Sequence, residues 1–299
     1  MVGKKILLAV VLTGTIISSC DNRAEPFVPG QEKPVKPDKP TVTDEKVYIP
    51  FDHRGVDNRP HIEKGTYTAK KIAELEKAFA DSMNKKKTVR GRVAMAGIFV
   101  VHNLDRSIPY SFPIWNYTKP DINPEYKYCG IYMRKGLFLK PLTENGKTYD
   151  PWGWPYPVTD AVKNAWPHTK FPDTTFPNGF TCSQYVDWCL LNAGITMYGS
   201  EDLYSKWATQ LRVFPGSKEV SLQQGSSTVR PGDLIGFPGH IALILGVVED
   251  YVIYASSDGG GDAGWALSGV HWHAYNRKTV NYDTYQYKFI IQMAGVYND

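Results

Sequence analysis

The spacing of apolar residues predicts helices in three parts of the chain. Residues 68–83 carry apolar side chains three or four positions apart, and Thr68 is a candidate N-cap, so we expect an amphipathic helix. Residues 88–103 have little polar face, which predicts a buried helix, with a strand at its C-terminal end as the alternative. Residues 182–193 place apolar side chains on one stripe, and Gly194 suits a left-handed C-cap.

Beyond residue 230 the pattern changes to short apolar runs that are typical of strands. These runs are 234–237, 241–248, 251–255, 270–273 and 287–296. Residues 241–255 should form a hairpin that turns near Glu249 and Asp250. Helices followed by consecutive strands predict an α+β fold, in which helices pack on a central antiparallel sheet of about five strands.

Residues 113–177 separate these two parts and are rich in proline and aromatic residues, as in the run 152–157. Proline at this density prevents long helices and central strands, so we expect a long irregular insertion. Its aromatic side chains either pack the insertion onto the domain or form a surface that stacks on sugar rings or peptide.

The N-terminus has the pattern of an export signal: Lys4 and Lys5 precede a short apolar run that ends at Ser19 and Cys20. This resembles the lipobox of bacterial lipoproteins, which implies a signal peptide at 1–19 and lipidation of Cys20. The proline- and lysine-rich residues 20–50 predict an extended linker. We therefore expect an exported, membrane-anchored lipoprotein, periplasmic or on the outer membrane or cell surface.

The remaining residues, 51–299, are expected to form a single domain, since 42% hydrophobic and 13% aromatic content suit a packed core. The net charge of +4 gives no reason to expect a nucleic-acid partner. No other stretch reaches the roughly 18 apolar residues of a spanning helix, so the lipid anchor should be the only membrane contact. We expect a monomer without a cofactor.

Cys182 is the first candidate for chemistry, because it lies in the first turn of its predicted helix. The partial positive charge and free N–H groups of a helix N-terminus stabilise a thiolate, and the same N–H groups can bind an oxyanion. Cys189 should face the core. Seven helical residues separate the two cysteines by about 10 Å, too far for a disulfide. A bridge between Cys129 and Cys189 is compatible with the sequence.

His240 is the candidate base, because it follows a Pro-Gly pair and begins an apolar strand. A histidine at the mouth of a strand can accept the thiol proton and later return it to a leaving amine. His271 and His273 alternate on one predicted strand face and are two potential metal ligands. No companion ligands are evident, so no metal is expected.

The residues around Cys182 and His240 form a longer pattern. Residues 178–194 read Asn-Gly-Phe-Thr-Cys-Ser-Gln-Tyr-Val-Asp-Trp-Cys-Leu-Leu-Asn-Ala-Gly, and residues 229–246 contain Pro-Gly-Asp-Leu before the histidine strand. Together they resemble the NlpC family of papain-like cell-wall cysteine peptidases. The resemblance covers 88–112 and 178–299, with 113–177 as an insertion, and implies a papain-like fold.

In that family the cysteine is the nucleophile and the histidine its base, which implies these roles for Cys182 and His240. Tyr110 lies in a segment similar to the family's Pro-Tyr turn, and we expect Tyr110 and Ser183 to contact substrate.

The chain departs from the family pattern at three positions. Thr181 replaces the usual aspartate, and Gln184 replaces a common glycine. The third polar residue of the family, commonly histidine, corresponds to Tyr254. Asp258, four residues further on, is the alternative acceptor for the histidine, and the sequence leaves this choice open because the hairpin register is not determined.

The resemblance implies hydrolysis of amide bonds in peptidoglycan stem peptides, typically between D-glutamate and the diamino acid. The expected partner is therefore peptidoglycan or its peptide fragments. Two alternatives remain open: an amidase or acyl transferase on the same scaffold, and a non-catalytic wall-binding lipoprotein.

Overall fold

The computed structural model describes residues 47–55, 57–110, 134–144, 146–157, 175–195, 216–237, 240–259, 269–284 and 288–299. The expected signal peptide, Cys20 and most of the expected linker lie outside these ranges, as do Cys129 and much of the 113–177 insertion. No helix within the described ranges is long and apolar enough to cross a membrane.

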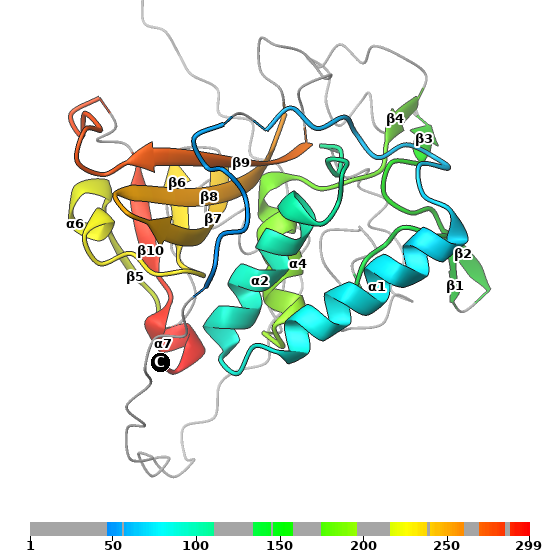
Figure 1. The fold of residues 1–299 in the computed structure, drawn as a ribbon, viewed down its shortest axis with the longest axis horizontal. Helices are drawn as coiled ribbons and strands as arrows, with labels where there is room; N and C mark the ends of the chain where they lie inside the picture. Colours follow the sequence, from blue (N-terminus) through cyan, green and yellow to red (C-terminus); the bar gives the residue numbers. More distant parts are fainter. Residues whose placement is uncertain are drawn as a thin grey trace, which may run out of the picture. The chain divides into compact units, whose positions relative to one another are not determined.

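A six-stranded antiparallel sheet forms the centre of the fold, in the order β5-β10-β6-β7-β8-β9 (Figure 1). Its strands are β5 Lys218–Ser221, β6 Leu234–Phe237, β7 His240–Val248, β8 Tyr251–Asp258, β9 Gly269–Asn276 and β10 Phe289–Gln292. The predicted α+β class and antiparallel sheet are thus confirmed, and the sheet has one strand more than expected.

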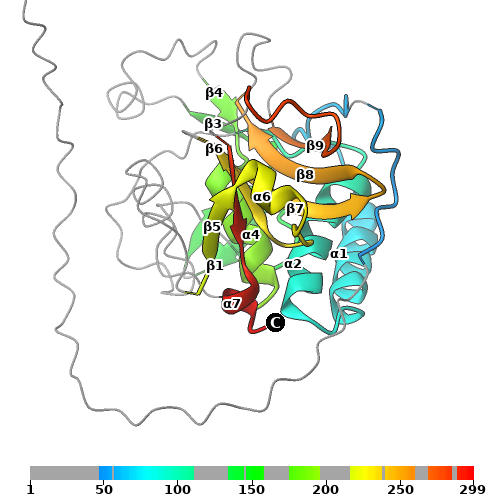
Figure 2. The ribbon, with the colours of Figure 1, turned by 90° about the vertical axis from the view of Figure 1, so that its left-hand side faces the viewer.

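Three helices cover one face of the sheet in two layers. α2 (Val89–His102) and α4 (Cys182–Asn192) contact β7 and each other, and α1 (Ala69–Asn84) packs on α2. α6 (Leu222–Ser226) covers the opposite face against β5 and β10, as the turned view in Figure 2 shows. Both faces of the sheet are therefore hydrophobic, each with its own buried cluster.

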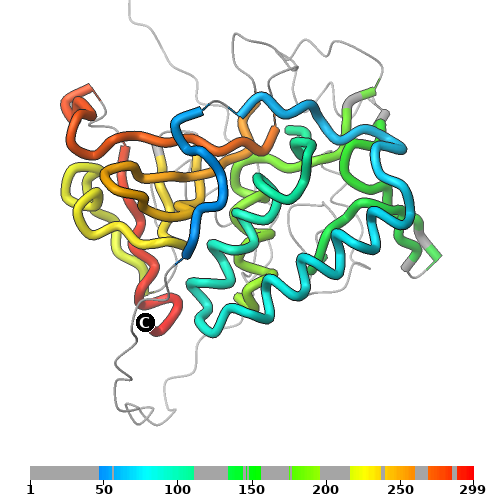
Figure 3. Tube along the Cα trace, viewed as in Figure 1, coloured from blue at the N-terminus to red at the C-terminus, as the bar shows by residue number. Residues whose placement is uncertain are grey.

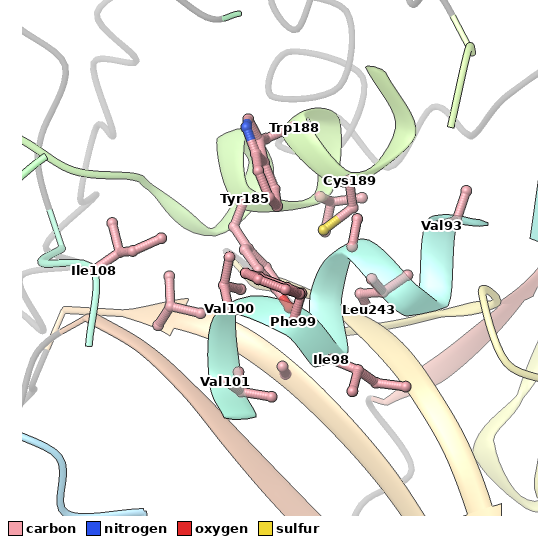
Figure 4. Packing of buried hydrophobic residues seen from close by; sticks show 14 of the residues in the cluster. Val93, Ile98, Phe99, Val100, Val101, Ile108, Tyr185, Trp188, Cys189 and Leu243 are labelled. Carbon is pink, nitrogen blue, oxygen red and sulfur yellow. The ribbon is translucent and has the colours of Figure 1, made fainter. Parts of the chain in front are cut away.

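The predicted helices have the expected bounds and caps. Thr68 accepts a hydrogen bond from the N–H of Lys71 at the start of α1, whose buried residues are Ile72, Leu75, Phe79 and Met83. α2 is helical to its end and buried on nearly all sides, so its strand alternative is excluded. Figure 4 shows Tyr185, Trp188 and Cys189 of α4 packed with Phe99 of α2 in one layer between the helices.

The end of the chain differs from the prediction of one long strand over 287–296. β10 ends at Gln292, and a short helix, α7 (Ala294–Tyr297), follows. The backbone leaves the sheet because the N–H of Met293 donates to the buried carboxylate of Asp233, at 2.9 Å, instead of to a neighbouring strand. Asp233 in turn pairs with Arg90 of α2.

The strand at the edge of the sheet, β5, is short and mostly exposed, and its residues have no apolar pattern that would predict it. The described parts of the insertion form two small hairpins. They are β1 (Leu142–Glu144) with β2 (Lys147–Tyr149), and β3 (Pro155–Pro157) with β4 (Thr175–Pro177). Trp152 is buried, with its ring centroid 5.6 Å from that of Trp188, so this aromatic residue packs the insertion onto the domain.

The segment before α1 crosses from the sheet to the helices, as the trace in Figure 3 shows. Arg59 donates to the carbonyl groups of Val100 and Leu104 beside α2 and to that of Val270 in β9. Its charge is matched by Asp57, at 2.7 Å. This buried ion pair ties the helical layer to the outer edge of the sheet.

Gly97 allows the two helices and β7 to meet. A Cβ atom at this position would lie 2.7 to 2.8 Å from side-chain atoms of Leu245, Leu243 and Tyr185. We predict that Gly97→Ala lowers the free energy of unfolding by about 1–3 kcal/mol through overpacking, although alanine is the better helix former. Urea denaturation of the variant measures this loss. Lys70→Ala, at an exposed position of α1, is the control and should change stability by less than about 0.5 kcal/mol.

Candidate active site

Cys182 begins α4 and is partly exposed. A capping box precedes it: the N–H of Gln184 donates to the Thr181 hydroxyl, and the Gln184 amide oxygen accepts from the N–H of Thr181 at 2.9 Å. The N–H groups of Cys182 and Ser183 remain in the first turn, and no acceptor within the described residues is bonded to them. They are the donors that an oxyanion at this helix end requires.

Cys189 is the second cysteine of α4 and has a different environment. It is fully buried and in no disulfide, so the bridge to Cys129 that the sequence left open is not formed. Burial raises the pKa of this thiol well above its usual value, and the neighbouring Tyr185 hydroxyl does not offset this effect. Cys189 therefore remains a neutral thiol within the core.

The chain that leads into α4 is held by its neighbours on both sides. The N–H of Phe180 donates to the carbonyl of Pro109, and the hydroxyl of Ser257 in β8 donates to the carbonyl of Phe180 at 2.8 Å. Gly179 is required at this junction, because a Cβ atom there would lie 1.8 Å from the Pro109 carbonyl oxygen. The end of β8 and the start of α4 are thus joined directly.

His240 begins β7 and contacts both the cysteine and a carboxylate. Its ring is within hydrogen-bonding reach of the Cys182 thiol. Its Nε2 atom lies 2.9 Å from Oδ1 of Asp258. Burial alone would lower the pKa of His240, but the hydrogen bonds to Asp258 and Cys182 and their negative charge raise it to about 9. The imidazole therefore keeps its proton at neutral pH.

Asp258 ends β8 and accepts three hydrogen bonds. Oδ1 accepts from His240, and Oδ2 accepts from the Ser256 hydroxyl at 2.9 Å and from Nε2 of His273 at 2.8 Å. Burial alone would raise the pKa of this carboxyl group, but the hydrogen bonds and charges of the two histidines lower it below its usual range. Asp258 is therefore ionised at neutral pH, where His240 is charged.

Between the two candidates for the third position, the geometry favours Asp258. The pairing of β7 with β8 places Tyr254 opposite Ile244, four residues, or about 13 Å, along β7 from His240. The tyrosine ring stacks on His273, with centroids 5.3 Å apart and planes at 24°. Tyr254 thus belongs to the surroundings of the site.

The two residues expected to contact substrate lie near the start of α4. Tyr110 pairs with Phe180 in an isolated bridge, and a Cβ atom on Gly259 would lie 3.5 Å from the Tyr110 ring. This places Tyr110 beside the ends of β8 and of the segment entering α4. The Ser183 hydroxyl is largely buried and lies 3.3 Å from that of Thr181, so a substrate contact from Ser183 would come from its N–H group.

The two histidines of β9 each lie beside a carboxylate. His273 contacts Asp258, and Nδ1 of His271 lies 3.6 Å from the Asp57 carboxylate. Within the described ranges, no group of three or more His, Cys, Asp and Glu side chains is placed to hold a metal ion. The contacts of Ser256 and His273 with Asp258, and of Ser257 with Phe180, were not predicted from the sequence, which indicated only that His271 and His273 share one strand face.

Comparison with protein-family models, with curated proteins and with solved structures found no match for this chain. The function must therefore be argued from the site itself.

The raised pKa of His240 makes stability depend on pH in a defined window. The folded-state pKa of about 9 exceeds the ordinary 6.5, so the stabilisation is complete below pH 6.5 and disappears as pH rises through 9. We predict that the difference in free energy of unfolding between wild type and His240→Gln shrinks by up to about 3 kcal/mol from pH 6.5 to 9.5.

Urea denaturation at half-unit pH steps measures this difference. His102→Gln is the matched control, because the pKa of His102 is lowered by burial and by Arg59, so its titration falls below the window. A His240 difference that stays constant from pH 6.5 to 9.5 would contradict the prediction.

Proposed function

We propose that this chain is a cysteine hydrolase of the papain-like type, with Cys182 as nucleophile, His240 as general acid and base, and Asp258 as the residue that orients His240. The proposal rests on one observation: a partly exposed cysteine at a helix N-terminus contacts a histidine that keeps its proton and is hydrogen-bonded to a partly buried carboxylate. This is the charge arrangement that stabilises a thiolate.

The reaction follows from these positions. The Cys182 sulfur attacks the carbonyl carbon of an amide, and the N–H groups at the start of α4 bind the oxygen that becomes negative. His240 donates its proton to the leaving nitrogen as the C–N bond breaks, which leaves a thioester on the sulfur. His240 then removes a proton from water, whose hydroxide attacks the thioester and releases the carboxylic acid. Asp258 keeps the imidazole ring aimed at the sulfur throughout.

The proposed substrate is the stem peptide of peptidoglycan, cleaved between D-glutamate and the diamino acid. The resemblance of residues 178–194 and 229–246 to the NlpC family supports it, together with the lipoprotein signal before Cys20. The protein would accordingly be exported and held at a membrane by its lipid anchor, where peptidoglycan is within reach.

The decisive test is digestion of purified peptidoglycan by wild type and Cys182→Ala. We predict that the substitution lowers the release of muropeptides by at least about 10³-fold, because it removes the nucleophile. Cys189→Ala is the matched control on the same helix and should retain activity, since Cys189 has no part in the reaction.

Mass spectrometry of the fragments identifies the bond. New N-terminal diamino acids support the endopeptidase, and free amino-sugar ends without peptide cleavage indicate an amidase instead. Unchanged release by Cys182→Ala would refute the cysteine hydrolase, and no release by either protein would leave the wall-binding alternative.

A second pair of variants tests the third position. We predict that Asp258→Ala lowers kcat by roughly 100-fold or more, because His240 loses the acceptor that orients its ring and supports its charge. Tyr254→Phe keeps the ring that stacks on His273 and should stay within about threefold of wild type. Steady-state kinetics on a soluble stem peptide measures both, and the opposite ranking would assign the third position to Tyr254.

A further inference from the structure

The Asp258 carboxylate contacts a second histidine, which has no role in the proposed mechanism. Nε2 of His273 lies 2.8 Å from Oδ2, and the same oxygen accepts from the Ser256 hydroxyl at 2.9 Å. His240 uses the other oxygen, Oδ1, at 2.9 Å. We propose that His273 is a positioning residue, which fixes the Asp258 carboxylate so that Oδ1 stays directed at His240. This inference rests on the proposed function and extends its site to four residues.

The position of Asp258 explains why a second donor is needed. The residue is the last of β8, and its side chain is 31% exposed, so water competes for its oxygens. A carboxylate with one partner can rotate and exchange its two oxygens. Ser256 and His273 both bind Oδ2, which leaves Oδ1 as the oxygen available to His240.

His273 is itself held in place by the tyrosine that occupies the family's third position. Tyr254 is opposite His273 in the pairing of β8 with β9, and the two rings stack. The imidazole is 42% exposed and has little other support, so the stacking limits its rotation. Tyr254 would thus act on the site through His273 and Asp258 rather than by touching His240.

The proposal is tested first on the reactivity of the cysteine, which needs no knowledge of the substrate. The rate constant for iodoacetamide at pH 7, in which the Cys182 sulfur displaces iodide, reports how well His240 is held beside it. We predict that His273→Leu lowers this rate constant about tenfold, in the range seen when a partner of a ligating side chain is removed. His273→Gln keeps an N–H donor and should stay within about threefold of wild type. Cys182→Ala gives the background from the other cysteines.

A double-mutant cycle separates positioning from a general structural effect. In the Asp258→Ala background there is no carboxylate to position, so His273→Leu should have no further effect on the rate constant. An equal loss in both backgrounds, or an equal loss with leucine and glutamine, overturns the proposal. If His273→Leu fails to fold, Tyr254→Leu tests the same proposal, because it removes the ring that stacks on His273. We expect it to lower the rate constant about threefold.

Kinetics on peptidoglycan peptides complete the test. His273→Leu should lower kcat and leave KM unchanged, because His273 contacts Asp258 and Tyr254 and would act on the reaction through Asp258. If wild type cleaves no peptidoglycan but the alkylation cycle shows coupling between His273 and Asp258, the peptidase proposal fails and the positioning role stands. If cleavage depends on Cys182 but the cycle shows no coupling between His273 and Asp258, the peptidase proposal stands and the positioning role fails.

Discussion

The hydrogen bond between His240 and Asp258 depends on one extra residue in β7. Near the turn, Val248 pairs with Tyr251 and Gly246 with Ile253, but beyond a bulge at Leu245 the register shifts, so that Leu243 pairs with Ala255. Continued to the end of the strands, the shifted register sets Asp258 opposite His240. Side chains of directly opposed residues project from the same face of a sheet, so the two can meet.

Without the bulge, Asp258 would instead be opposite Ile241. The Ile241 side chain is buried in the cluster under the helices, and a carboxylate on that face would be in the hydrophobic core. The bulge therefore decides whether the site has an acceptor for its histidine. Leu243 and Leu245 both belong to that buried cluster, and Gly246 leaves room for Ile49, so the packing around the strand stabilises the extra residue.

The bulge also shows which parts of the structure could be predicted from the sequence and which could not. Helical periodicity predicts α1, with Thr68 as its N-cap, and α4, because local spacing decides which side of a helix is buried. The N-cap role of Thr181 was not predicted. The pairing of β7 with β8 was also predicted, but its register was not, since a bulge has no reliable signature in a single sequence. The choice between Tyr254 and Asp258 was open for this reason. β5 was missed because a short exposed edge strand needs no apolar pattern.

The residues on either side of Cys182 also determine the geometry of the site. Thr181 and Gln184, which differ from the pattern that the sequence otherwise resembles, are the N-cap and N3 residues of one capping box. Each satisfies the backbone N–H of the other, so the pair defines where α4 begins without adding a charge. An aspartate at the N-cap would place a negative charge next to the Cys182 sulfur, whereas the neutral threonine adds none. The two residues therefore fix the start of the helix and leave its N-terminus without an added negative charge.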